Sequence, residues 1–121
     1  MWHAPYLPDL FSIDVRPDRD RVVLEPIGEV DLHTAGEVRD RIKQLLEDGW
    51  QHVVLDLRQV TFMDSTGVHL LLDCQRRLAE PHHSFAIVDG TPVVKQLLDL
   101  TGLSERFPRA SGVETTAAFA G

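Results

Sequence analysis

Apolar and polar residues alternate near the start of the chain. Residues 11–15 follow a period of two, which is typical of a half-buried strand, and residues 17–20 have the composition of a turn. We expect residues 21–30 to form a second strand that pairs with the first as a hairpin. Pro26 lies inside this second strand and has no N–H for the ladder, so an irregularity or an edge position is expected near Glu25 and Pro26.

The rest of the chain alternates between helical and strand-like patterns. Three helices are expected, each beginning at a capping residue that is followed by apolar residues at helical spacing. The capping residues are Thr34, which can form a capping box with Glu37, then Asp64, and finally Thr91, which precedes a proline. Short apolar runs predict buried strands over residues 51–57 and 85–88. A second capping box over residues 111–114 predicts a short final helix through Ala117.

This order of elements is typical of a small α/β fold. Because parallel strands are connected by right-handed crossovers through helices, we expect a mixed β-sheet with a parallel centre and helices packed on it. A length of 121 residues is that of one typical domain. We expect an N-terminal arm over residues 1–10, which contains prolines and has no period, and one domain over residues 11–121.

Composition and charge restrict the class of partner. With 43% hydrophobic and 26% charged residues, the chain has the composition of a globular domain. Nineteen acidic and twelve basic residues give a net charge of −7, which disfavours direct binding to nucleic acid or to an anionic membrane surface. No apolar run is long enough for membrane insertion, and the single cysteine, Cys74, cannot form an internal disulfide. We therefore expect a cytoplasmic protein whose partner is another protein.

Ligands and partners of parallel sheets bind at the carboxyl ends of the strands. Three polar segments are predicted to follow strand ends: residues 29–34, which include Asp31 and His33, then residues 63–67, and residues 89–91. We expect these segments to lie together on one face of the molecule.

The enzymatic interpretations of this face each lack a residue that their chemistry requires. A phosphoacceptor aspartate of the receiver type needs a lysine at a strand end, but both lysines fall inside predicted helices. A nucleophile elbow around Ser65 needs a glycine where Met63 stands, and the chain has no glycine-rich nucleotide-binding loop. The pair His82–His83 is more typical of a solvated helix end than of a metal site. We expect no catalytic residue, metal or cofactor.

The remaining candidate is the pair of hydroxyls that follows Asp64. With Asp64 as the N-cap, Ser65 and Thr66 occupy the first helical positions, where unpaired N–H groups and the helix dipole tolerate a phosphate. Such a phosphate adds a charge of about −1.5 to −2 beside Asp31 and Asp64, which would disturb a docked partner but not the fold. An ordinary helix start has the same residue types, so the spacing alone leaves both interpretations open.

Four segments resemble STAS domains, and specifically bacterial anti-sigma factor antagonists, in their order and spacing. They are GEVDL at residues 28–32, VLDL at 54–57, VTFMDSTG at 60–67 and LLDLTGL at 97–103. The likeness spans about residues 11–119. Its specific part is MDSTG at residues 63–67, which is similar to the site at which an anti-sigma factor kinase phosphorylates the antagonist.

The resemblance implies a partner-switching protein rather than an enzyme. In its unphosphorylated form it would bind an anti-sigma factor serine kinase of the histidine-kinase-like ATPase fold and free the sigma factor for transcription. Phosphorylation of Ser65 would release it, and a metal-dependent serine phosphatase would reverse the modification; Thr66 is a minor acceptor candidate. The partner-binding residues that the resemblance implies are Asp31, His33, Asp64, Ser65, Thr66, Gly67 and His69.

The resemblance also leaves an alternative function open. STAS domains serve as soluble subunits of membrane transport or lipid-trafficking complexes, in which the serine need not be phosphorylated. Two positions depart from the family pattern: Pro26 interrupts the strand before Gly28, and His69 stands where relatives often have a small residue. His69 either changes the choice of partner or is an exposed helix side chain without that role.

Overall fold

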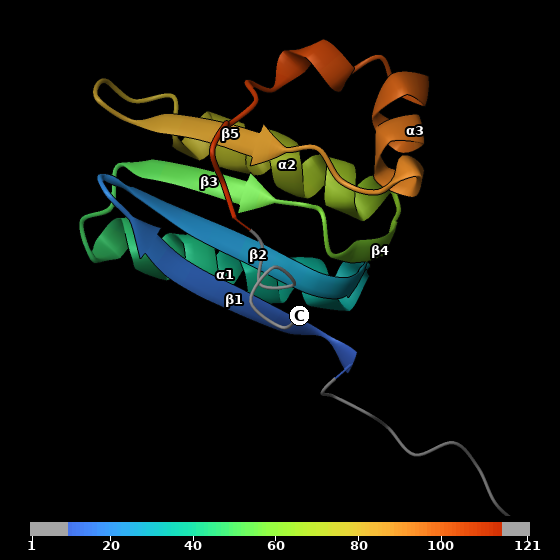
Figure 1. The fold of residues 1–121 in the computed structure, drawn as a ribbon, viewed down its shortest axis with the longest axis horizontal. Helices are drawn as coiled ribbons and strands as arrows, with labels where there is room; N and C mark the ends of the chain where they lie inside the picture. The colour runs from blue at the N-terminus through green and yellow to red at the C-terminus, as the bar shows by residue number, and fades with distance from the viewer. Residues whose placement is uncertain (1–9, 115–121) are drawn as a thin grey trace, which may run out of the picture.

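The computed structural model describes residues 10–114, in which a mixed sheet carries two helices on one face (Figure 1). Apart from Leu10, the expected N-terminal arm lies outside the described residues. The elements, in chain order, are β1 (Ser12–Asp18), β2 (Arg21–Val30), α1 (Leu32–Glu47), β3 (His52–Asp56), β4 (Val60–Met63), α2 (Ser65–Arg77), β5 (Ser84–Val88), α3 (Pro92–Leu100) and a 3-10 helix (Ser104–Arg106).

The sheet has the order β1-β2-β3-β5, and β4 pairs with the carboxyl end of β2. The hairpin of β1 and β2 is antiparallel, whereas β2, β3, β4 and β5 pair in parallel. The predicted mixed sheet with a parallel centre is therefore confirmed. Strand β4 was not predicted from the sequence, because only its two end residues are buried and no alternation marks it.

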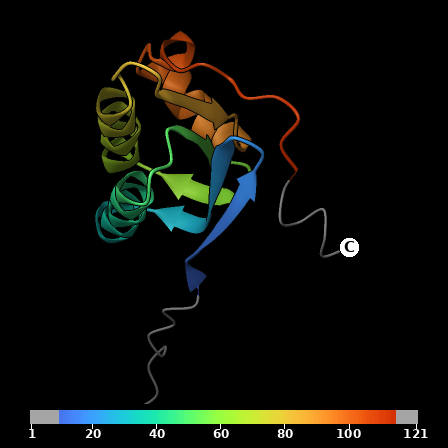
Figure 2. The same cartoon turned by 90° about the vertical axis from the view of Figure 1, so that its left-hand side faces the viewer.

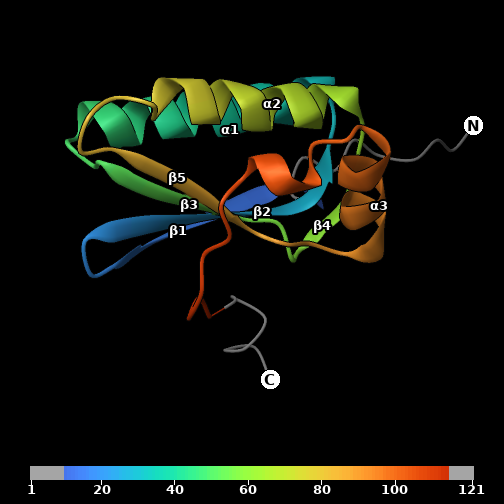
Figure 3. The same ribbon diagram turned by 90° about the horizontal axis from the view of Figure 1, so that it is seen from above.

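Helices α1 and α2 lie side by side on one face of the sheet (Figures 2 and 3). The main core forms between this helix layer and the sheet, where fully buried Leu24 and Leu55 of the strands meet Ile42 of α1 and Leu71 of α2. Helix α3 stands at the end of the sheet against β4. The carboxyl ends of β2 and β4 lead directly into the first turns of α1 and α2.

Pro26 occupies an interior strand, so the expected edge position is wrong. Strand β2 pairs with β1 on one side, and on the other side with β3 as far as Leu24 and with β4 from Gly28 onward. Pro26 falls between these two partners, where the missing N–H interrupts neither ladder. The expected irregularity is present as a register shift between Gly28 and Glu29.

The first helix begins three residues before the expected start. Asp31, not Thr34, is its N-cap, and Thr34 occupies the third helical position of a capping box with Asp31. The match of Thr34 and Glu37 to the capping-box pattern was coincidental. The helix starts predicted at Asp64 and Thr91 are confirmed.

The chain after the 3-10 helix crosses the opposite face of the sheet as an extended segment (Figure 2). The final helix expected from Ser111 does not begin there, because Gly112 has φ 68°, and the rest of that expected helix lies outside the described residues. Arg21 and Arg58 donate hydrogen bonds to the carbonyls of Ser111 and Val113 at 3.0 and 2.5 Å. These contacts hold the segment on the sheet.

Candidate functional site

The register of two parallel strands brings the candidate site together. Val30 of β2 pairs with Met63 of β4, so the residues that follow, Asp31 and Asp64, leave the sheet side by side. Each aspartate is the N-cap of the next helix, α1 or α2. One surface hollow is lined by both aspartates together with Leu32 and His33. The structure therefore joins two of the segments that the sequence placed at strand ends.

Asp31 is held by the first turn of α1. Its Oδ1 accepts hydrogen bonds from the backbone N–H groups of His33 and Thr34, both at 3.0 Å. The Thr34 hydroxyl accepts from the Asp31 N–H at 2.9 Å and donates to the Glu29 carbonyl at 2.7 Å. Hydrogen bonding from Thr34, aided by His33, lowers the pKa of the Asp31 carboxyl. Asp31 is thus an ionised, oriented carboxylate on the surface.

Asp64 performs the same function for α2. Its Oδ1 accepts from the Thr66 N–H at 2.9 Å and from the Thr66 hydroxyl. These hydrogen bonds, with a further one from the Gly67 N–H, lower the pKa of the Asp64 carboxyl, while the nearby charge of Asp31 opposes the shift. The two carboxylates therefore stand close enough to interact electrostatically.

The hydroxyls of Ser65 and Thr66 differ in their surroundings. The Thr66 hydroxyl is engaged by Asp64 and is only partly exposed, because it completes the cap of α2. Ser65 is exposed at the first helical position, and among residues 10–114 its hydroxyl forms no hydrogen bond. Ser65 is consequently the more exposed of the two residues, with a hydroxyl that takes no part in the cap.

The other expected site residues fall into two groups. His33 and His69 are exposed, and His69 lies one helical turn after Ser65. Gly67 is buried instead, and a Cβ there would overlap Met63 Cγ and lie 2.8 Å from its Sδ. The absence of a side chain at Gly67 lets the first turn of α2 pack closely on β4.

The third predicted segment contributes differently. The carboxylate of Asp89, after β5, accepts a hydrogen bond from Arg109 at 2.9 Å, and it does not line the hollow with Asp31 and Asp64. Instead, Thr91 donates its hydroxyl to the Val60 carbonyl at 3.1 Å, which ties the start of α3 to β4. Asp89 is therefore not part of the hollow that joins the other two segments.

Large apolar residues are exposed on α1, on β4 and in the first turn of α3, and they were not predicted from the sequence; of these, Leu32 lines the hollow with the two aspartates. They are Leu32 at the start of α1, Phe62 on β4 and Val93 in the first turn of α3, which are 78%, 44% and 46% exposed. Leu32 precedes the helix start that the sequence predicted, and Phe62 lies on the strand that it missed. A signal was available in both cases, since each residue is within two positions of an expected site aspartate.

The hollow that contains the two aspartates is acidic and has no permanently charged basic residue. The hollow between the two aspartates is lined by no lysine or arginine. Among residues 10–114, no three His, Cys, Asp or Glu side chains are grouped so as to hold a metal ion. The face therefore offers carboxylates and apolar side chains to whatever docks on it.

The site therefore consists of two capped helix starts and an exposed serine, at the carboxyl ends of two adjacent parallel strands. The chain belongs to the STAS domain family, whose family model matches residues 12–118. It is 30% identical over 98 residues to the anti-sigma F factor antagonist of Paenibacillus polymyxa, which covers 80% of this chain and 84% of that protein. It is 26% identical over 87 residues to the anti-sigma-B factor antagonist of Staphylococcus aureus, covering 72% and 81% of the two chains.

Solved structures show the same likeness. An anti-sigma factor antagonist from Mycobacterium paratuberculosis superposes with a TM-score of 0.77 at 27% identity, over 88% of this chain and 91% of that one. The anti-sigma factor antagonist SpoIIAA in its unphosphorylated form superposes with a TM-score of 0.69 at 25% identity, over 84% and 89% of the two chains. The resemblance found in the sequence is therefore confirmed.

Proposed function

We propose that this protein is an anti-sigma factor antagonist whose binding is switched off by phosphorylation of Ser65. The observation that carries the proposal is the exposed Ser65 hydroxyl at the first position of α2, directly after Asp64, whose carboxylate shares a hollow with that of Asp31. The names of the relatives support the same function, and SpoIIAA is described explicitly in an unphosphorylated form.

The unphosphorylated protein docks through the face around Ser65. Leu32, Phe62 and Val93 supply apolar contacts, and Asp31 and Asp64 supply ionised hydrogen-bond acceptors of fixed orientation. We propose as the partner an anti-sigma factor serine kinase of the histidine-kinase-like ATPase fold, and a metal-dependent serine phosphatase as the enzyme that resets the switch. The protein itself acts as substrate and ligand, not as a catalyst, and it works in the cytoplasm.

Phosphorylation changes this face more than it changes the fold. The helix dipole at the first turn of α2 favours the new charge, although the N–H groups of Thr66 and Gly67 are already bonded to Asp64. A partner packed against the face would instead have to bury a phosphate beside Asp31 and Asp64, with no lysine or arginine lining the hollow. A hundredfold loss of affinity requires about 2.7 kcal/mol, which is within reach of such a desolvation penalty.

The test combines labelling and binding. The protein is incubated with its kinase partner and ATP, and the phosphate is located by mass spectrometry in the wild type and in Ser65→Ala and Thr66→Val. We expect one phosphate on the wild type and on Thr66→Val, and none on Ser65→Ala. Calorimetry with the anti-sigma factor is expected to show tight binding for the wild type and Ser65→Ala, and about a hundredfold weaker binding for the phosphorylated protein.

Two results would contradict the proposal. Undiminished labelling of Ser65→Ala would move the acceptor elsewhere. Equal recovery of a transporter ATPase component by the wild type, Ser65→Ala and Ser65→Glu would favour the alternative function, a STAS subunit of a membrane transport or lipid-trafficking complex.

None of the helices that the structure describes is long and apolar enough to cross a membrane.

A further inference from the structure

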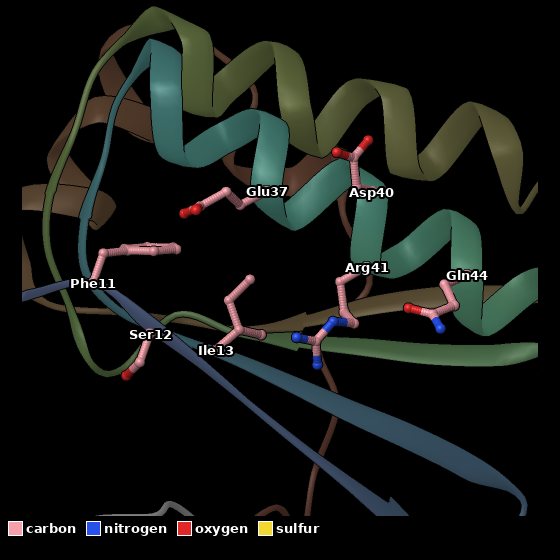
Figure 4. A pocket seen from close by; sticks show the side chains of 7 residues that line it. All are labelled: Phe11, Ser12, Ile13, Glu37, Asp40, Arg41 and Gln44. Atoms are coloured by element: carbon pink, nitrogen blue, oxygen red, sulfur yellow. The ribbon is translucent and has the colours of Figure 1, made fainter. Parts of the chain in front are cut away.

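A groove runs between the edge strand β1 and helix α1 (Figure 4). It consists of two adjoining hollows of about 400 and 680 Å³, which share Phe11 and Glu37. The larger hollow also borders Asp31 and His33, and these two residues line the hollow next to Asp64. The β1–α1 groove is therefore continuous with the face that carries Ser65, although it does not include Ser65.

The groove has an apolar floor and an acidic rim. Phe11 and Ile13 point from the β1 side toward α1, and Ile27 of β2 extends the floor. Glu37 points back from α1 toward Phe11, and Glu29 lines the larger hollow. Within residues 10–114, neither Glu29 nor Glu37 forms an ion pair.

The backbone of β2 makes room for this floor. Gly28 has φ 121°, a conformation that favours glycine, and a Cβ there would lie 2.5 Å from the Leu10 carbonyl oxygen. Because Gly28 has no side chain, residues 10–11 can cross the end of β2 closely. The crossing brings Phe11 to the junction of the two hollows.

We propose that the β1–α1 groove binds an arginine side chain on a segment of the protein partner that covers the Ser65 face. The aliphatic stem would lie on Phe11 and Ile13, and the planar guanidinium would reach the carboxylates of Glu29 and Glu37. Charge complementarity favours a cation, since both rim glutamates lack an internal counterion and the whole chain carries a net charge of −7. Arginine fits better than lysine, because a guanidinium can stack on an aromatic ring while pairing with carboxylates.

The inference rests on the proposed function only for the identity of the partner. The groove supplies a contact that phosphorylation of Ser65 leaves intact, so the phosphorylated protein would still offer its partner an attachment point. Arg41, one turn after Glu37 on α1, is the one guanidinium among the described lining residues, and its side chain points toward the Ile13 side of the groove (Figure 4). Arg41 forms no ion pair with Glu37, but its positive charge repels an incoming guanidinium and in this sense competes with the partner's arginine.

The test uses a tripeptide, N-acetyl-leucyl-arginyl-leucinamide, titrated into the isotopically labelled full chain and followed by NMR chemical shifts. Its control is the citrulline analogue, which has the same shape without the charge. We expect shifts at the amides of Phe11 and Glu37 and an affinity at least about tenfold above that of the citrulline peptide. The double variant Glu29→Gln/Glu37→Gln should lose this preference, whereas Glu47→Gln, at the other end of α1, should retain it.

Three outcomes would overturn the proposal: equal affinity for both peptides, an unchanged preference in the double variant, or shifts confined to Asp31, Asp64 and Ser65. The variant Arg41→Gln provides a test in the opposite direction, because removal of the competitor should tighten binding of the arginine peptide. Ser65→Glu should bind the peptide as the wild type does. A failure of Ser65 labelling would therefore contradict the proposed function while leaving this measurement unaffected.

Discussion

At the scale of single residues, the Asp64 carboxylate holds the first turn of α2 in place. It accepts two hydrogen bonds from Thr66 and thereby leaves the neighbouring Ser65 hydroxyl exposed. Asp64→Ala is expected to lower the free energy of unfolding by about 1 kcal/mol in urea denaturation, because the cap is lost. Asp64→Asn keeps a capping oxygen and should cost much less. Equal losses in the two variants would show that charge, not capping, stabilises this helix start.

The two capping aspartates also predict an acid-dependent loss of stability. Hydrogen bonds from Thr34 and from Thr66 lower the pKa values of Asp31 and Asp64 in the folded protein. Their contribution is therefore complete above the unfolded-state pKa of about 3.9 and is lost as the pH falls through the lower folded values. Chemical denaturation between pH 5 and pH 2 should show a smaller loss for Asp31→Asn/Asp64→Asn than for the wild type. Parallel curves would contradict this assignment.

Two helical glycines should respond in opposite ways to the same substitution. Alanine normally stabilises a helix relative to glycine by about 1 kcal/mol, and a Cβ on Gly36 of α1 meets nothing within 4 Å. A Cβ on Gly67 of α2 would overlap the buried Met63 side chain, so Gly67→Ala is expected to destabilise by about 1–3 kcal/mol. Thermal unfolding of both variants measures the contrast. A stabilised Gly67→Ala would mean that α2 can move away from β4 without cost.

At the scale of elements, the end of β3 depends on an ion pair on the sheet face opposite the helices. Asp56 is fully buried and accepts hydrogen bonds from the Arg58 N–H and guanidinium at 2.8 to 3.1 Å. Arg58→Met would leave the carboxylate without that partner and is expected to cost about 3 kcal/mol. Arg76→Met, which breaks a pair with the partly exposed Asp73 on α2, should cost under about 0.5 kcal/mol. Similar unfolding free energies for both variants would contradict the importance of burial.

Most helices and strands, but not all, could be predicted from the sequence. Strands and helices marked by a clear period or by an apolar run were predicted, although α1 begins three residues before its expected start. The short strand β4 was not, since its pairing with β2 is a tertiary contact that leaves no periodic mark. A helix was predicted from Ser111, but in the described residues from there up to Glu114 no helix begins, and Arg21 and Arg58 bind the carbonyls of Ser111 and Val113. Local capping patterns could not reveal these long-range hydrogen bonds.

The candidate site was predictable in its polar part and not in its apolar part. Asp31, Asp64 and Ser65 follow strand ends in a recognisable motif, and the parallel register of β2 and β4 brings them together. Leu32 and Phe62 look like core residues in the sequence, and only the structure shows that they are exposed beside the aspartates. Apolar residue type alone does not distinguish a core position from a docking position.

At the scale of the whole molecule, stability and switching are located in different places. The core lies between the helix layer and the sheet, whereas Ser65 lies on the surface at the carboxyl ends of the strands. We expect phosphorylation of Ser65 to change the melting temperature by no more than a few degrees, because the phosphate meets a favourable helix dipole and no core contact is lost. The same modification should weaken partner binding about a hundredfold. A large fall in melting temperature together with the loss of binding would mean that the switch operates by unfolding the first turn of α2 instead of by blocking the face.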